Sequence, residues 1–262
     1  MPRRKTVDPT TTAHRLGKDT ADPRPSNSLL AALPAEEFGR IAGELVTTPM
    51  RLKQILLRSG DPLEHVFFPN AGVCSVTVAT EDGHLVEVAT VGAEGLVGLD
   101  AVLGARHALT ETIVQMANAG DTLTRLPIAA FARELARHGT LSDLAFRYSR
   151  VLMSEMVQAT ACNALHRVDE RCCRWLLRMH DRAVGDQFYL SHEFLAVMLG
   201  VRRSSVTIVA GALQKAGLIR YAKAQVTILN RRRVEAASCE CYALLRQHVE
   251  RAQLPTLQRT RR

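Results

Sequence analysis

The stretch LGVRRSSVTIVAGALQKAGLI, residues 199–219, combines an apolar stripe with a polar, cationic face in one short segment. Val206, Val209 and Leu213 recur at helical spacing, which predicts that one face of a helix is buried. The opposite face begins with two arginines and two serines. Taken alone, the segment fits an ordinary solvated amphipathic helix as well as a helix that binds a partner. The flanking sequence decides between them.

The segments on either side predict a compact motif. Upstream, SHEFLAVMLG at 191–200 predicts a short helix that Ser191 caps, followed by a sharp bend that Gly200 permits. Downstream, LIRYAKAQVTILN at 218–230 alternates as a β-hairpin does. A helix, a tight turn, a second helix with a polar start and a hairpin are the plan of a winged helix-turn-helix.

Charge is distributed unevenly along the chain. The 262 residues, 47% of them hydrophobic, are enough for two domains with cores, and the net charge is +8. Residues 1–26 carry +3, residues 27–166 carry −5 and residues 167–262 carry +10. A positive charge concentrated at the predicted helix-turn-helix favours a polyanionic partner there.

The two ends of the chain lack the patterns of packed structure or of membrane insertion. Residues 1–26 are rich in Pro, Thr and charge, which predicts a disordered basic tail, and we expect a second basic tail at 246–262. No run approaches the roughly 18 apolar residues of a membrane span. The basic N-terminus has no apolar core of a secretory signal after it. We therefore expect a cytoplasmic protein without a membrane partner.

The first domain is predicted over residues 27–138. A helix is expected over about 34–44, and several short β-branched runs separated by glycine turns follow over 48–126. The clearest turn is EDG at 81–83, where Gly83 supplies a positive φ. Short strands with glycine-containing turns predict a sandwich or a barrel.

A long helix without Gly or Pro is predicted over residues 139–165. Its main apolar stripe has three- and four-residue spacing, and Met153 and Val157 widen the apolar surface beyond that stripe. Such width predicts contacts with both the helix's own domain and a second chain, although burial within one chain would also account for it. The residues of the stripe that we expect to form the dimer contact are Leu144, Tyr148, Leu152, Met156 and Ala159.

With these pieces in place, the chain resembles the Crp/Fnr family of transcription regulators over about residues 29–245. The most specific matches are LSHEFLAVMLGVRRSSVTIVAGALQKAGLIRY, similar to the family's DNA-binding motif, and VGAEGLVGLDAVLG, similar to a loop of its sensory domain. The resemblance implies an α+β protein with an N-terminal jelly roll (β-roll) of the cyclic-nucleotide-binding type, a dimerisation helix and a winged helix-turn-helix over 166–245. Its implied partners are double-stranded DNA and a second copy, with RNA polymerase left open as a third.

The resemblance carries DNA-contact roles onto individual positions. Arg203 matches the recognition-helix arginine, and Arg can bind guanine through two acceptors. Many members have Glu where this chain has Ser204 and Arg where it has Ile208, so the usual operator is not implied. The full predicted set is Ser191, His192, Arg202, Arg203, Ser204, Ser205, Thr207 and, at the wing tip, Lys223.

The predicted effector region departs from the nucleotide-binding members of the family. Glu94 and Gly95 stand in a similar loop, but Glu111 and Thr112 occupy the position of the expected phosphate-binding arginine. A carboxylate there would repel a phosphate. We therefore expect no binding of cyclic nucleotides, and no cofactor is identified.

The cysteines and histidines show no recognisable site in the sequence. No cysteine precedes Cys74, so the N-terminal iron–sulfur chemistry of other members is not supported, and the adjacent pair Cys172–Cys173 does not suit a tetrahedral metal. Cys239-x-Cys241 has no second pair nearby in sequence. We expect no metal site and interpret the thiols as small buried hydrophobes, with a redox role as the alternative.

Two other function classes fit the sequence less well than a DNA-binding regulator does. A sensing module with vestigial DNA binding would have lost its recognition-helix cations, yet Arg202 and Arg203 are both present. A thiol enzyme using Cys172 or Cys173 lacks a nucleophile–base spacing. The sequence thus predicts a protein that is not an enzyme.

Overall fold

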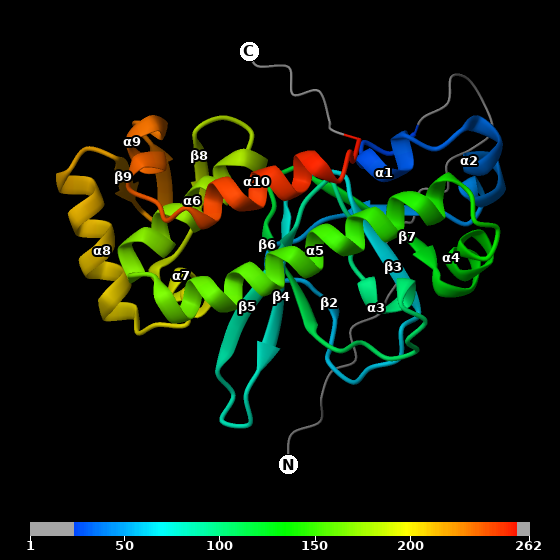
Figure 1. Ribbon diagram of the computed structural model, residues 1–262, viewed down its shortest axis with the longest axis horizontal. Helices are drawn as coiled ribbons and strands as arrows, with labels where there is room; N and C mark the ends of the chain where they lie inside the picture. The colour runs from blue at the N-terminus through cyan, green and yellow to red at the C-terminus, as the bar shows by residue number, and fades with distance from the viewer. Residues whose placement is uncertain (1–23, 256–262) are drawn as a thin grey trace.

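The computed structural model describes residues 24–255, and every structural statement below concerns that part of the chain. Most of the predicted N-terminal tail and the end of the predicted C-terminal tail lie outside the described residues. Figure 1 shows two lobes joined by one long helix, with a β-rich lobe on one side and a mainly helical lobe on the other. The predicted α+β architecture is confirmed.

The N-terminal lobe is built from two antiparallel sheets. One has the order β1-β7-β3 and the other the order β2-β6-β4-β5. The β4–β5 hairpin turns at the predicted glycine, Gly83, whose φ is +83°. The strands are β1 (Val46–Pro49), β2 (Ile55–Leu57), β3 (His65–Pro69), β4 (Val73–Ala79), β5 (Leu85–Val91), β6 (Glu111–Met116) and β7 (Thr122–Pro127). The helices of this lobe are α1 (Ser28–Ala31), α2 (Ala35–Ala42), α3 (Leu99–Val102) and α4 (Ile128–Leu135).

Helix α5 (Thr140–Leu165) crosses the molecule and connects the lobes (Figure 1). Its start is fixed by Glu37 of α2, whose carboxylate accepts hydrogen bonds from the backbone N–H groups of Thr140 and Leu141 at 2.9 and 3.1 Å. A carboxylate at a helix N-terminus satisfies unpaired N–H groups and complements the helix dipole. The first half of α5 belongs to the core of the β lobe.

The C-terminal lobe contains the predicted winged arrangement and four further elements. Helix α6 precedes this arrangement, strand β8 adds a third strand to the wing in the order β8-β10-β9, and α9 and α10 follow the wing. The elements are α6 (Val168–Arg182), β8 (Gln187–Tyr189), α7 (His192–Leu199), α8 (Arg203–Lys215), β9 (Ile219–Ala222), β10 (Gln225–Ile228), α9 (Arg231–Ala236) and α10 (Cys241–Arg251).

The prediction of a separate basic tail over 246–262 is wrong for its described part. Residues up to Arg251 complete α10, which runs back along α5, as Figure 1 shows. Leu245 is buried, and Leu254, just beyond α10, joins the core of the β lobe. The arginines of α10 lie on its exposed face. The number of cations in 246–262 therefore suggested a basic tail, whereas the segment up to Arg251 forms an amphipathic helix.

The two lobes pack against each other through a polar contact. Glu87 of β5 accepts hydrogen bonds from the Ser75 hydroxyl at 2.5 Å and from the indole N–H of Trp175 in α6 at 2.8 Å. Burial raises the pKa of Glu87 to about 7, outweighing these hydrogen bonds, and the carboxylate of Glu155 on α5 raises it further, whereas Arg174 lowers it. The interface therefore favours a protonated Glu87.

Glu87→Gln should stabilise the protein above neutral pH. The folded pKa lies above the ordinary value of 4.5, so stability falls as pH rises from about 4.5 to about 7, where the unfolded chain loses a proton that the folded chain keeps. The variant should lack this slope and gain about 3 kcal/mol at pH 8. Urea unfolding at fixed chain concentration between pH 5 and 8 measures it. Glu36→Gln on exposed α2 is the control, and an unchanged slope in Glu87→Gln would contradict the assignment.

Candidate functional site

The helix-turn-helix is fixed by a cap and a glycine. Ser191 Oγ accepts the Phe194 N–H at 3.1 Å and caps α7, while Gly200, with φ of +61°, ends it. Helices α7 and α8 are bent by 107° at this break, within the range of helix-turn-helix motifs. No single helix in the described part is long and apolar enough to cross a membrane; only this bent pair passes on length and composition when taken together.

Helix α8 has the two faces that the sequence predicts. Val206, Ala210 and Leu213 are buried against the lobe. The exposed face starts at Arg203, whose side chain is 70% exposed and whose Nε lies 3.9 Å from Glu193, the outer limit of an ion pair. Such a contact between exposed groups holds an arginine only weakly. Arg203 is thus available to an anionic partner.

The other recognition-helix residues fall into two groups. Arg202, Ser204 and Thr207 are exposed beside Arg203, and Ser205 is half-buried. An apolar residue, Ile208, is 73% exposed on the same helix. In the sequence, Ile208 stands out only as a departure from the family pattern. In the structure it places an exposed apolar side chain on the otherwise polar face of α8.

Ser191 and His192 lie inward of the predicted contact surface. The Ser191 hydroxyl is engaged in the α7 cap, as described above. His192 Nδ1 lies 3.1 Å from Thr207 Oγ1, and the centroid of its ring lies 4.4 Å from that of Tyr221, with the ring planes tilted at 42°. Burial, reinforced by Arg203, lowers the pKa of His192, so the ring is neutral at pH 7. His192 therefore orients Thr207, a role that the sequence did not indicate.

The wing ends in a tight turn without glycine. Lys223 and Ala224 have φ values of +49° and +59°, which two-residue hairpin turns require and glycine normally supplies. Lys223 is exposed at this tip. Tyr221 braces the wing, because its hydroxyl donates to the Leu190 carbonyl. The turn thus projects a lysine beyond the surface of the lobe.

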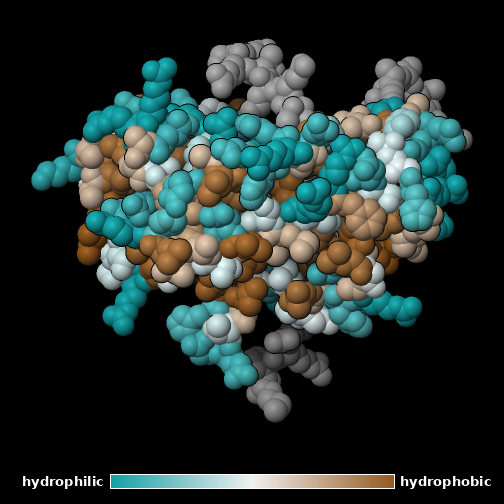
Figure 2. Space-filling view, in the orientation of Figure 1, coloured by the Kyte–Doolittle hydropathy of each residue, from teal (hydrophilic) through white to brown (hydrophobic). Residues whose placement is uncertain are grey.

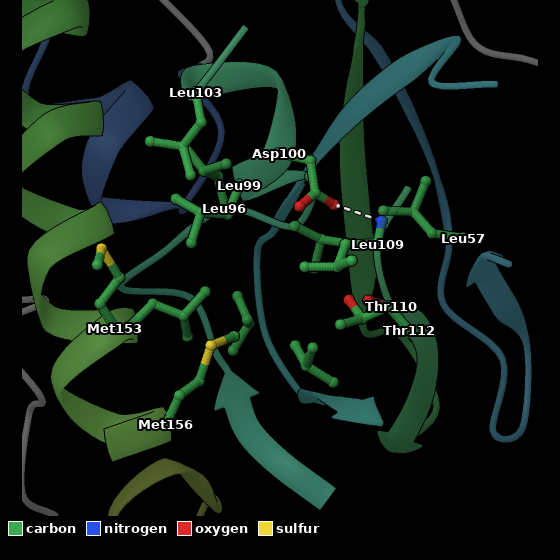
Figure 3. A pocket seen from close by; sticks show the side chains of 15 residues that line it. Leu57, Leu96, Leu99, Asp100, Leu103, Leu109, Thr110, Thr112, Met153 and Met156 are labelled. Atoms are coloured by element: carbon green, nitrogen blue, oxygen red, sulfur yellow. Dashed lines mark hydrogen bonds between the residues drawn. The ribbon is translucent and has the colours of Figure 1, made fainter. Parts of the chain in front are cut away.

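A second feature is a cavity of about 160 Å³ between the β lobe and α5. Figure 3 shows Met153 and Met156 reaching into it from α5, opposite Leu57 and Leu109. Asp100 is the single charged side chain among the described residues that line it, and Asp100 Oδ2 accepts the Leu109 N–H at 3.2 Å. The remaining lining is almost entirely apolar, which favours an apolar occupant.

Of the four predicted effector residues, the structure brings only Thr112 to the cavity. Glu94 turns to the C-terminal lobe, where Arg182 Nε donates to it at 2.9 Å, and Gly95 lies against the Tyr148 ring. Glu111 faces Arg58 at 3.7 Å. The placement of Glu94 corrects the expectation, because its partner is 88 residues away in sequence.

The predicted dimer face is also corrected. Leu144, Tyr148, Leu152 and Ala159 are buried in the chain's own core, and Met156 is half-buried. The exposed apolar residues of α5 lie on another face, at Phe146, Met153, Val157 and Leu165. Figure 2 shows apolar side chains gathered along the middle of this side of the molecule, over α5. Met153 and Val157, which widen the apolar surface of α5, are therefore available to a partner, whereas the main stripe is not.

Comparison with known proteins identifies the domain that contains α7 and α8. Residues 170–237, from the third residue of α6 to the end of α9, match the family model described as a Crp-like helix-turn-helix domain. The chain thus contains a Crp-like helix-turn-helix domain. It is 29% identical over 216 residues to the global nitrogen regulator of Synechocystis, an alignment that covers 75% of the chain and 91% of the relative.

Solved structures of Crp/Fnr-type regulators share the fold of the chain. FixK2 from Bradyrhizobium japonicum matches with a TM-score of 0.64 at 15% identity, covering 74% of the chain and 98% of FixK2. A Crp/Fnr-family transcriptional regulator from Eubacterium rectale matches with a TM-score of 0.63 at 17% identity, covering 81% and 98%. The family model shows the helix-turn-helix domain that the sequence predicts, and the solved structures show the fold.

The cysteines of the chain fall into two sets. Cys74, Cys172 and Cys173 are buried, and burial raises the pKa of each thiol, to about 12 for Cys173, so neither member of the adjacent pair is an activated nucleophile. The other three thiols meet His166. This Cys162–His166–Cys239–Cys241 cluster was missed because its halves are more than 70 residues apart in sequence.

Proposed function

We propose that the chain is a homodimeric transcription regulator that binds an inverted-repeat operator through α8 and the wing. The observation that carries this proposal is the exposed face of α8, with Arg203 at its first turn and Lys223 projecting from the adjacent wing. Both belong to the part of the chain with a net charge of +10. A helix that presents its N-terminal residues fits base edges in the major groove, and cations fit phosphates.

The same face favours a particular division of roles. Arg203 would contact a guanine through two acceptors, and Ser204 and Thr207 would donate to neighbouring bases or phosphates. Ile208 would contact a thymine methyl group, for which an exposed apolar side chain is suited. The operator should therefore differ from that of relatives with Glu and Arg at these two positions.

Pairing is proposed along the exposed stripe of α5. Phe146, Met153 and Val157 are separated by seven and four residues, the spacing of a coiled-coil seam, and Ala164 continues it seven residues later. All four positions are exposed in the single chain. Burying this stripe against a second copy removes apolar surface from water and gives two α8 helices a common axis.

Mapping of bound sites in cells tests the DNA-binding proposal. A tagged chain should be enriched at intergenic sites that share an inverted repeat, and the enrichment should be lost with Arg203→Ala. The position of these sites relative to transcription starts separates activation, with RNA polymerase as a partner, from repression. Enrichment that is indifferent to Arg203→Ala would contradict the proposal.

The cavity in the β lobe is the proposed effector site, and its chemistry favours a small apolar molecule. Its volume is close to that of engineered apolar cavities of about 150 Å³ that bind benzene. Met153 belongs to both the cavity lining and the exposed α5 stripe. A ligand that moves Met153 would therefore alter the surface at which two copies meet.

Cyclic AMP and cyclic GMP should show no binding by isothermal titration calorimetry at micromolar to millimolar ligand concentrations. A cyclic phosphate would meet the Asp100 carboxylate and an apolar wall, with no arginine among the described lining residues to neutralise it. Micromolar affinity for either nucleotide would overturn this assignment. Benzene or toluene serves as the comparison and should raise the melting temperature, an effect that Met156→Trp, by filling the cavity, should remove.

A further inference from the structure

Four potential metal ligands converge where α5 ends and α10 begins. Cys162 lies on the last turn of α5, and His166 follows four residues later as its C-cap. Cys239 and Cys241 come from the entry to α10. One ligand atom from each residue lies within 4.8 Å of all the others. The two pairs are therefore brought together by the packing of α10 on α5.

We propose that Cys162, His166, Cys239 and Cys241 bind one zinc ion in a closed tetrahedral Cys₃His site. A Zn–S bond of about 2.3 Å and a Zn–N bond of about 2.0 Å imply tetrahedral edges of roughly 3.5–3.8 Å. The Sγ atoms of Cys162 and Cys239 lie 3.6 Å apart, and Cys241 Sγ lies 3.4 Å from His166 Nδ1. These two edges already have the size that the ion requires.

Groups around the cluster have the chemistry that supports metal ligands. His166 Nε2 lies 3.2 Å from Glu240 Oε1, which leaves Nδ1 for the ion in the carboxylate–histidine–metal arrangement. The side-chain amide of Gln158 donates to Cys241 Sγ at 3.0 Å. Thiols that served only as small hydrophobes would need neither contact.

Charge balance also fits an ion. Binding releases one proton from each thiol, so Zn²⁺ with three thiolates and a neutral imidazole carries a net charge of −1. Arg174 is buried nearby, and its Nε has no hydrogen-bond partner among the described residues. Its guanidinium acts electrostatically on Cys162. The guanidinium thus compensates the excess negative charge.

The burial of the cluster favours a structural metal over a catalytic one. The three cysteines are nearly inaccessible, and the four ligands leave no open coordination position. The ion would join the end of α5 to the start of α10, one on each side of the DNA-binding elements α6 to α9. It would thereby fix this lobe on α5, and this inference does not depend on whether α8 binds DNA.

Metal titration of the full reduced chain tests the proposal. The chain is first stripped of metal with a chelator and reduced. When Zn²⁺ is then added, native mass spectrometry should show one Zn²⁺ per chain. When Co²⁺ is added instead, the chain should show the visible and near-ultraviolet absorption bands of a tetrahedral thiolate site. Zn²⁺ should displace Co²⁺ and raise the melting temperature.

Three variants connect these signals to the cluster. Cys162→Ala should weaken binding by more than about 100-fold, and Glu240→Gln, on an exposed side chain, by roughly 10-fold. Cys173→Ala, a buried cysteine outside the cluster, is the matched control and should retain one ion. A folded wild-type chain that takes up no ion, or a Co²⁺ spectrum unchanged in Cys162→Ala, would overturn the proposal. A Cys162–Cys239 disulfide in the isolated protein, with no metal uptake after reduction, would overturn it too.

Discussion

Met153→Glu combined with Val157→Glu should convert the proposed dimer into monomers. Both side chains are more than half exposed in the single chain, so the substitutions should leave the fold of each chain intact. In the proposed pairing they lie at the seam, where carboxylates from both copies would be buried without partners. Unpaired buried charges cost several kcal/mol, and a loss of about 3 kcal/mol or more corresponds to at least a hundredfold weaker association.

Sedimentation velocity at micromolar chain concentration measures this effect, with circular dichroism to confirm folding. Val184→Glu, at an exposed apolar residue outside α5, should remain dimeric. Leu152→Glu should behave differently from the double variant. Leu152 is buried in the core, so its substitution should unfold the β lobe and not merely separate the two copies. A double variant that stays dimeric would place the pairing surface elsewhere.

Arg203→Ala should weaken operator binding by about 1–3 kcal/mol, or roughly 5- to 150-fold. The reason is the loss of a two-point contact with a guanine, so preference should relax at one base pair in each half-site. The side chain is largely exposed, and only a long contact to Glu193 is lost in the free protein. Stability should therefore change by no more than a few tenths of a kcal/mol.

Lys223→Ala is the matched comparison because it removes one cation from the wing tip. Its loss should weaken binding to all sequences alike and reduce the slope of log affinity against log salt by roughly one unit. Fluorescence anisotropy of operator and scrambled duplexes, at several salt concentrations, separates the two behaviours. If Arg203→Ala weakened both duplexes equally, Arg203 would be a phosphate contact and the assignment of base recognition would fail.

Local patterns predicted the fold well where the physical cause is local. Ser191 as a cap, Gly200 at the bend and the buried face of α8 follow from nearest neighbours in the chain, and the structure has all three. The β4–β5 hairpin was found because a glycine marks its turn. By contrast, α10 was missed, since its cations suggested a tail and its apolar face is apparent only against α5.

The sites depended on contacts between distant segments, which one sequence does not reveal. Which apolar face of α5 is covered depends on the β lobe, so the main stripe was assigned to the partner although it belongs to the core. The sequence places Glu94 in the predicted effector region, whereas in the structure its carboxylate pairs with Arg182 of the other lobe. The cluster of Cys162, His166, Cys239 and Cys241 forms only because α10 packs against α5, a contact that the sequence alone does not show.

Selection from a pool of random duplex DNA, with wild type and Arg203→Ala compared, tests the central claim most directly. Two α8 helices related by the α5 axis should enrich an inverted repeat whose half-sites are one helical turn apart, roughly 34–36 Å. Arg203→Ala should enrich the same repeat with one relaxed position in each half. An unrepeated site, or identical motifs from both proteins, would contradict recognition of DNA by α8 in a dimer.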